Sequence, residues 1–387
     1  MKRLAIILKR LAMVLAIVSG FQAPAFAERW KIQYFYDEGR DTLVIEDLAF
    51  PSGTHGIAVG TIQDELSRKK ARYVALVSSD GGARWAIKEL QEHPRSIFFL
   101  NESEGWMVTD DSFWYTETSG AAWKRIAPQI KPDKKISQLP SGLITRVWFL
   151  DAKHGFAVGL QKSVYESKNG GVTWTPVAAA AQPPGDPKFT AYTQIYFEGG
   201  KAGMIYGASA PPRRDEPNLP EWMEPERAAK RRKVPTLALD LRTGDAGATW
   251  KSESAEVFGV MSNVCLAGAD GLSVQQFDQT FDSPSEVYHM DARAGKVTSV
   301  YRDKLRVMDC AIFRGPRAFL AAVEPPGRLN TAPIPGKVKI LSSTNLTDWT
   351  EMDVDYKANA RSLIMAGPDA EHLWVATDTG MILHLLP

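Results

Sequence analysis

The chain has 387 residues, with 46 Lys and Arg against 45 Asp and Glu and a formal net charge of +1 at pH 7. This balance gives no support to a nucleic-acid partner or to a partner chosen by bulk charge. Only two cysteines occur, Cys265 and Cys310, which excludes a disulfide-rich scaffold. Both cysteines stand in apolar runs, so we expect buried free thiols, with a bridge between them as the alternative.

Residues 1–27 are typical of a cleavable secretory signal. Basic residues precede the apolar run LAMVLAIVSG, and the small residues of APAFA follow it. The apolar run is short for a membrane span, although an uncleaved N-terminal anchor remains the alternative. We therefore expect a mature chain that begins at residue 28 and is exported to the periplasm or the extracellular space.

One eight-residue phrase recurs along the chain. It reads SSDGGARW at 78–85, SKNGGVTW at 167–174 and TGDAGATW at 243–250. Gly permits a positive φ, and Ser, Asp or Asn can bond nearby backbone amides, so the phrase predicts a turn. Its Trp is expected to begin a strand and to pack between neighbouring repeats.

Two degenerate copies of the phrase support the same spacing. TETSGAAW at 116–123 has Thr118 at the carboxylate position, and SSTNLTDW at 342–349 lacks both the Asp and the Gly. In the second copy we expect Ser342 and Trp349 to hold the first and last positions of the turn.

A second motif precedes the phrase. HGIAVG at 55–60 and HGFAVG at 154–159 are its best copies, and weaker copies begin at 104, 202, 270, 316 and 371. The period of about fifty residues indicates a repeat architecture. Short alternating runs of β-branched and aromatic residues predict four strands in each repeat. The sequence therefore predicts an all-β fold, a seven-bladed β-propeller of four-stranded blades over residues 28–387.

The last repeat lacks a fourth strand, because the chain ends at ATDTGMILHLLP. The stretch ERWKIQYF at 28–35 carries an aromatic residue in front of a strand-like run. We expect this N-terminal strand to complete the last blade and so to close the ring without a free edge.

Three long loops are predicted between second and third strands, at 61–72, 208–235 and 323–336. They would share one face of the ring with the loops that join the blades, and long loops are common sites of function. The alternative is that they are tolerated insertions.

The longest loop, 208–235 in blade four, is a charged and Pro-rich insertion. Its candidate partner-binding residues are Arg213, Arg214, Arg231 and Arg232. The basic run at 227–233 could engage an acidic protein patch or anionic headgroups, which leaves peripheral membrane contact open. A solvated loop is the default interpretation.

The phrase S-x-D-x-G-x-x-W is the Asp-box, or BNR repeat, of sialidase-like propellers. Its combination with hGxAVG, best seen at 42–90 and 144–176, resembles the photosystem II assembly factor family, the Ycf48-like or HCF136-like propellers. The resemblance implies an exported, non-enzymatic propeller that binds a partner protein and assists a membrane complex. The insertion at 208–235 departs from the family pattern and puts a shared partner in doubt.

Three further arginines, Arg95, Arg146 and Arg361, stand near the starts of predicted innermost strands. Together they would present guanidinium groups at the mouth of a central channel, where planar bidentate donors suit a partner's carboxylates. The family resemblance also implies an arginine-bearing binding face. The alternative is that each arginine pairs with a local acid such as Asp151 or Glu46.

A sialidase-like glycoside hydrolase or a carbohydrate-binding propeller is the second hypothesis. The three arginines could form a carboxylate-binding triad, and Asp47, Asp151 and Asp309 lie near inner strands. However, the F/Y-R-I-P signature is absent, and its nearest string is FRGP at 313–316. A lectin would need exposed aromatic residues, for which Trp222 is the clearest loop candidate. We therefore predict no catalytic residue.

The six histidines include no pair at metal-ligand spacing, and His55, His154 and His372 recur at one register that marks a turn. We expect no metal site and no cofactor. The resulting hypothesis is an exported monomer that binds a membrane or envelope protein as an assembly or stability factor, with no nucleic-acid partner.

Overall fold

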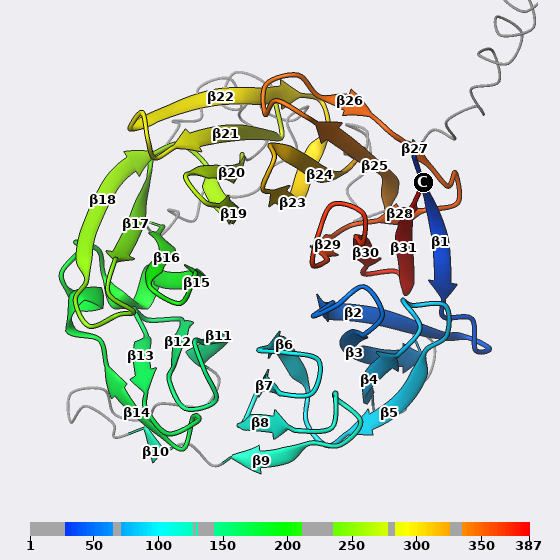
Figure 1. Ribbon diagram of the computed structural model, residues 1–387, viewed down its shortest axis with the longest axis horizontal. Helices are drawn as coiled ribbons and strands as arrows, with labels where there is room; N and C mark the ends of the chain where they lie inside the picture. Colours follow the sequence, from blue (N-terminus) through cyan, green and yellow to red (C-terminus); the bar gives the residue numbers. More distant parts are fainter. Residues whose placement is uncertain are drawn as a thin grey trace, which may run out of the picture.

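The structure, a computed structural model, describes residues 28–64, 71–126, 129–130, 143–210, 235–277, 283–325 and 335–387. Its strands form seven mainly antiparallel sheets that are arranged as a ring, with one edge strand of each sheet nearest the axis (Figure 1). The predicted seven-bladed β-propeller is therefore confirmed.

The first three blades follow one another along the chain, each with its strands in sequence order from the axis outward. Blade 1 contains β2 (Asp41–Ala49), β3 (Gly56–Asp64), β4 (Arg72–Ser78) and β5 (Ala86–Leu90). Blade 2 contains β6 (Pro94–Phe99), β7 (Gly105–Thr109), β8 (Phe113–Thr116) and β9 (Lys124–Ile126). Blade 3 contains β11 (Ile144–Phe149), β12 (Gly155–Gly159), β13 (Val164–Ser167) and β14 (Thr173–Pro176), with β10 (Gln129–Ile130) added in parallel at its edge.

Two 3₁₀ turns, η2 (Ala178–Ala181) and η3 (Pro187–Phe189), lead into the next three blades. Blade 4 contains β15 (Thr190–Glu198), β16 (Ala202–Ser209), β17 (Thr236–Thr243) and β18 (Lys251–Val257). Blade 5 contains β19 (Val260–Ala267), β20 (Asp270–Gln276), β21 (Ser285–Asp291) and β22 (Lys296–Asp303). Blade 6 contains β23 (Arg306–Phe313), β24 (Arg317–Val323), β25 (Gly336–Ser343) and β26 (Thr350–Glu351), and β28 (Asn359–Ala360) also pairs with β25.

Blade 7 joins the two ends of the described chain. Its inner strands are β29 (Leu363–Ala366), β30 (Trp374–Thr377) and β31 (Met381–Leu386), and its outer strand is β1 (Arg29–Phe35), antiparallel to β31. The short β27 (Asp353–Val354) adds to β1 in parallel. The side chain of Trp30 on β1 is fully buried, and its ring meets that of Phe319 edge to face at 6.4 Å. The N-terminal strand therefore closes the ring as predicted.

The last glycine of the hGxAVG motif has a steric reason. Gly60 pairs with Ile45 where the register of β2 against β3 shifts, so the inner strand bulges toward it. A Cβ atom on Gly60 would lie 2.2 Å from the carbonyl oxygen of Val44, and one on Gly159 would lie 1.9 Å from that of Leu143. At these two bulges the inner backbone approaches so closely that a side chain would clash, and glycine leaves room for it.

The repeated phrase forms the turn between third and fourth strands, as predicted. In blade 1 the Ser78 hydroxyl accepts a hydrogen bond from the Gly82 amide at 2.9 Å, and the Asp80 carboxylate accepts one from the Arg84 amide at 2.9 Å. The turns that begin at Thr116, Ser167 and Thr243 repeat both bonds. In these turns, side-chain oxygens therefore accept the hydrogen bonds that the backbone amides donate.

The turn of blade 6 corrects the expected register by one residue. Ser343, not Ser342, takes the first position, and the Asn345 side chain accepts hydrogen bonds from the amides of Thr347 and Asp348. This turn is one residue shorter than the others, so counting back from Trp349 misplaces its start.

The tryptophans of the phrase pack between blades. Trp174 in blade 3 lies 5.4 Å from the ring of Phe113 in blade 2, and Trp250 in blade 4 lies 5.5 Å from that of Phe156 in blade 3. These contacts confirm the role predicted for the aromatic position.

The expectation of free thiols is wrong. Cys265 on β19 and Cys310 on β23 form a disulfide that joins the innermost strands of blades 5 and 6. The apolar sequence around each cysteine did not reveal this pairing, because only the ring places the two strands side by side.

Several predicted segments lie outside the described residues. They are the signal segment 1–27 and most of the long loops, including 211–234 of the insertion. The ends of these loops are described, and they connect second and third strands in blades 1, 4 and 6. In the described ranges we find no helix with the length and apolar character that a bilayer span requires.

Candidate functional site

The inner wall of the ring carries a repeated irregularity. Six of the seven innermost strands, as the structure describes them, shift register once against their second strands. The residues that directly follow these shifts, here called the bulge ring, are Asp47, Ser96, Arg146, Gln194, Asn263 and Asp309. All six are polar, so the sequence places polar groups at one level of the wall.

The bulge ring links several neighbouring blades. Ser96 donates a hydrogen bond to the carbonyl oxygen of Thr145 at 2.7 Å, and Gln194 donates one to that of Ser262 at 3.2 Å. The Asn263 amide donates to the carboxylate of Asp309. These bonds join blades 2 and 3, 4 and 5, and 5 and 6.

The two carboxylates of the ring bond backbone amides across blade junctions. Asp47 accepts hydrogen bonds from Leu48 at 3.0 Å and from Ile97 of blade 2 at 2.9 Å. Asp309 accepts them from Cys310 and from Met365 of blade 7, both at 2.7 Å. Burial raises the pKa of Asp47 above its ordinary value and raises the pKa of Asp309 to about 7. Their oxygens are therefore already engaged in holding the fold.

Arg146 is the cation of the bulge ring. Its side chain is 42% exposed, and within the described part of the chain its ion contact is with Asp47, whose Oδ2 lies 3.9 Å from Nη1. That separation is too long for a hydrogen bond. The charge of Arg146 lowers the pKa of both Asp47 and Asp309 against the effect of burial. Arg146 therefore faces both acids and keeps N–H donors for another acceptor.

Arg95 and Arg361 are held differently. Arg95 Nε lies 2.6 Å from a carboxylate oxygen of Asp110, and Arg361 Nε lies 2.7 Å from one of Asp378. Both acids stand in turns between second and third strands, so these two arginines lie at the face that carries the long loops. Burial raises the pKa of Asp110, but the hydrogen bonds and charges of Arg95 and His93 together outweigh it, so the pKa is lowered.

The three arginines are thus near the starts of innermost strands, as expected, but they are not equivalent. Arg146 belongs to the bulge ring, Arg95 is the residue just before it in blade 2, and Arg361 precedes β29. Pairing with local acids does occur, but not with the acids named from the sequence. Asp151 instead accepts hydrogen bonds from the amides of its own turn. The arrangement gives no convergent arginine triad of the sialidase type.

The other candidates lie elsewhere. Arg213, Arg214, Arg231 and Arg232, with Trp222, fall outside the described residues. Cys265, Asp309 and Cys310 have potential ligand atoms within 4.8 Å of one another. Because the two sulfurs are bonded to each other, no thiolate is present there to bind a metal.

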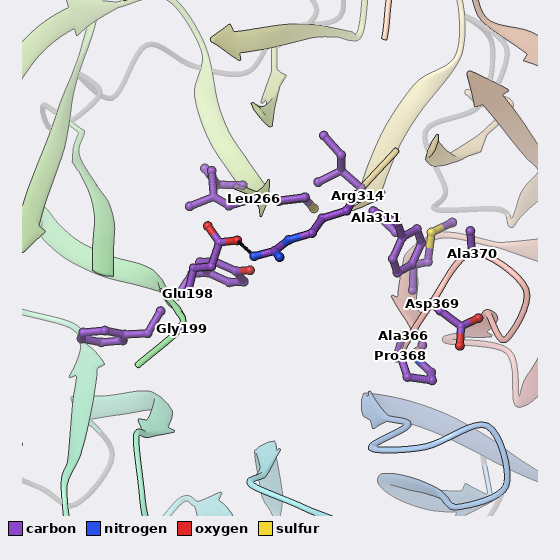
Figure 2. A pocket seen from close by; sticks show the side chains of 18 of the residues that line it. Glu198, Gly199, Leu266, Ala311, Arg314, Ala366, Pro368, Asp369 and Ala370 are labelled. Carbon is purple, nitrogen blue, oxygen red and sulfur yellow. Dashed lines mark hydrogen bonds and ion pairs between the residues drawn. The ribbon is translucent and has the colours of Figure 1, made fainter. Parts of the chain in front are cut away.

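The sequence did not predict the pocket at the opposite ends of the innermost strands. It has a volume of about 1100 Å³, and its lining includes Trp148, Tyr196, Leu266, Phe313 and Arg314 (Figure 2). Alternation could have indicated it, because Trp148 and Tyr196 each follow a bulge-ring residue by two positions and so share its side of the strand.

No protein-family model and no curated protein matches the chain. Among solved structures it is similar to YCF48 bound to D1 peptide, with 16% identity, 92% of this chain and 100% of that chain covered, and a TM-score of 0.55. YCF48 from Cyanidioschyzon merolae gives 13% identity, coverage of 92% and 98%, and a TM-score of 0.57.

The propeller domain of the Trilobed protease from Pyrococcus furiosus is also similar, with 12% identity, coverage of 89% and 95%, and a TM-score of 0.51. Similarity at these identities establishes the fold and leaves the chemistry to the site. The resemblance to Ycf48-like propellers is therefore confirmed at the level of the fold.

Proposed function

We propose that this protein is an exported propeller that binds a partner protein and acts as an assembly or stability factor for a membrane or envelope complex. The observation that carries the proposal is Arg146, a half-exposed guanidinium on the inner wall whose acid neighbour stands 3.9 Å away. A carboxylate from a partner would complete its bidentate hydrogen bonding.

Two further observations support the proposal. One structural neighbour is YCF48 bound to D1 peptide, which is a propeller that holds a peptide. The Cys265–Cys310 disulfide suits an exported chain, because such bonds persist in oxidising compartments.

The enzyme hypothesis receives less support from the site. Asp47 and Asp309 direct their oxygens to backbone amides, and Arg95 and Arg361 are paired with turn acids. A hydrolase would need such groups free to reach a substrate. Binding of a partner's acidic segment requires only Arg146 and the surrounding loop face.

The test is affinity capture from a membrane extract with the chain from residue 28 onward, followed by mass spectrometry and by titration with a synthetic peptide of the captured segment. We expect R146A to weaken binding about tenfold or more, since a charged hydrogen-bonded pair is lost. R146K should restore part of it.

The matched control is R84A, which removes an exposed arginine from a turn at the other face. Melting temperatures of all variants separate binding from folding. Equal peptide affinity for R146A and the unaltered chain would refute this site. A failure to capture any protein would refute the proposed function.

A further inference from the structure

The proposed function does not use the pocket at the far end of the ring. Its lining comes from the ends of the innermost strands of blades 3 to 7 and from the turns that follow them. Because Arg361 precedes β29 while Ala366 ends it and lines the pocket, the pocket and the arginine face lie at opposite ends of the same strands. A volume of about 1100 Å³ is ample for side chains of a ligand.

One side of the pocket is aromatic. The rings of Trp148 and Tyr196 lie with their centroids 5.3 Å apart, and both side chains are only partly buried. Leu266 and Phe313, also partly buried, extend this apolar surface. The pocket can therefore take up an apolar segment and offers ring faces to a cation.

Negatively charged groups outnumber positively charged ones in the pocket lining. Three carboxylates, those of Glu198, Asp369 and Glu371, line the pocket together with one guanidinium, that of Arg314. Glu371 is exposed, and its carboxylate has no ion pair with another described residue. A cationic ligand would complement this excess of negative charge.

Arg314 shows how a guanidinium fits. From the turn after β23 in blade 6, its side chain reaches across to Glu198 in blade 4, with Nη2 2.8 Å from Oε1 (Figure 2). The same Oε1 accepts a hydrogen bond from the Gly268 amide of blade 5 at 2.9 Å. Arg314 is 82% exposed, and ion pairs in such a position contribute little to stability and are readily exchanged.

We propose that this pocket binds a basic side chain, flanked by apolar residues, on an extended segment of a partner protein. The incoming cation replaces Arg314 at Glu198 and lies against the faces of Trp148 and Tyr196, and Glu371 adds negative charge to the lining. Its neighbours along the segment contact the apolar lining. The proposal does not rest on the proposed function, because it concerns the opposite face and a ligand of opposite charge.

The experiment measures fluorescence anisotropy of three capped, labelled pentapeptides that differ at the centre, with arginine, glutamate or leucine between two leucines. We expect the arginine peptide to bind at least about tenfold more tightly than the other two, with a strong dependence on salt. Binding of the glutamate or leucine peptide as tightly as the arginine peptide would overturn the proposal. So would a failure of all three to bind.

Variants then locate the site. E198Q and E371Q should each weaken the arginine peptide about threefold to tenfold, and R314A should strengthen it by a similar factor because a competing cation is removed. R84A also removes an exposed arginine at this face but outside the pocket, so the affinity for the arginine peptide should not change. R146A, at the opposite face, should not change this affinity either.

Two results would contradict the assignment. One is unchanged or weaker binding in R314A, which would show that Arg314 does not compete with the ligand. The other is retention of a neutral oligosaccharide on a glycan array that the arginine peptide displaces, which would assign the aromatic surface to a sugar. Because Arg314 and Glu371 are exposed, neither substitution threatens the fold, so these outcomes remain readable.

Discussion

The carboxylate of Asp309 in blade 6 accepts a hydrogen bond from the backbone amide of Met365 in blade 7, with 2.7 Å between Oδ2 and the nitrogen. Asp47 makes the same bond from blade 1 to Ile97 of blade 2. Two junctions of the ring therefore share one arrangement, in which a buried acid accepts a hydrogen bond from a backbone amide of the next innermost strand. Because the acid can be protonated, this arrangement makes the stability of the ring depend on pH.

We expect the contribution of Asp309 to the free energy of unfolding to fall as the pH rises. Its pKa is about 7 in the folded protein and about 3.9 in a solvated chain, so the folded state holds an extra proton between these values. The contribution of Asp309 is therefore fully present below about pH 4 and is lost through pH 7, at a slope approaching 1.4 kcal/mol per pH unit.

Urea unfolding from about pH 4.5 to about pH 7.5 would measure this slope. The free energy of unfolding of the unaltered chain should fall relative to D309N as the pH rises. D111N, a change at an exposed acid of a turn, should follow the unaltered chain. If D309N and the unaltered chain keep a constant difference, Asp309 does not titrate in this range.

The disulfide should be a major source of stability. Cys265 and Cys310 are 45 residues apart, and for a loop of that length chain entropy predicts a loss of about 4 kcal/mol when the bond is removed. The double variant C265A/C310A should unfold at correspondingly lower denaturant concentration. Alkylation of both cysteines in the unreduced native protein, detected by mass spectrometry, would show that the bond is absent.

Gly247 should tolerate no side chain. It has a φ of +86°, and a Cβ atom there would lie 2.2 Å from the ring of Phe156 in blade 3. We expect G247A to lower the free energy of unfolding by about 2–4 kcal/mol through strain and overpacking.

Two glycines serve as controls for Gly247. Gly244, in the same turn, has no positive φ, and a Cβ atom added to it would meet no neighbour within 4 Å, so G244A should be nearly neutral. G295A, with a φ of +60° and open space, isolates the backbone strain, which we expect to be about 1 kcal/mol. Equal effects at Gly244 and Gly247 would contradict the packing described for this junction.

Closure of the ring should depend on Trp30. Its side chain is fully buried between blade 7 and blade 6, where the indole N–H meets the sulfur of Met352 at 3.4 Å. W30A should cost about 3–5 kcal/mol of stability, whereas R29A, at an exposed position of the same strand, should cost little. A small loss in W30A, measured by thermal unfolding, would mean that β1 does not hold the last blade.

Local patterns predicted much of the fold. The turn phrase and the hGxAVG motif recur because several blades use the same side-chain oxygens at a turn, and blades 1, 3 and 4 use the same glycine opposite a bulge. Those requirements act within a few residues of Ser78 or Gly60, so they are visible in the sequence. The N-terminal strand could be assigned as well, since the last repeat lacks a fourth strand and the strand-like run at 28–35 precedes the first repeat.

The site depended on contacts between blades, which local patterns do not contain. Residues such as Asp309 and Met365, or Glu198 and Arg314, are far apart in the sequence and meet only because the ring gathers the innermost strands of different blades around one axis. The same holds for the Cys265–Cys310 bond, and for the different surroundings of Arg95, Arg146 and Arg361. The sequence by itself determined the repeating blade, because turns and bulges are local. Only the tertiary structure decided which polar groups face one another across the axis, because ring closure sets those distances.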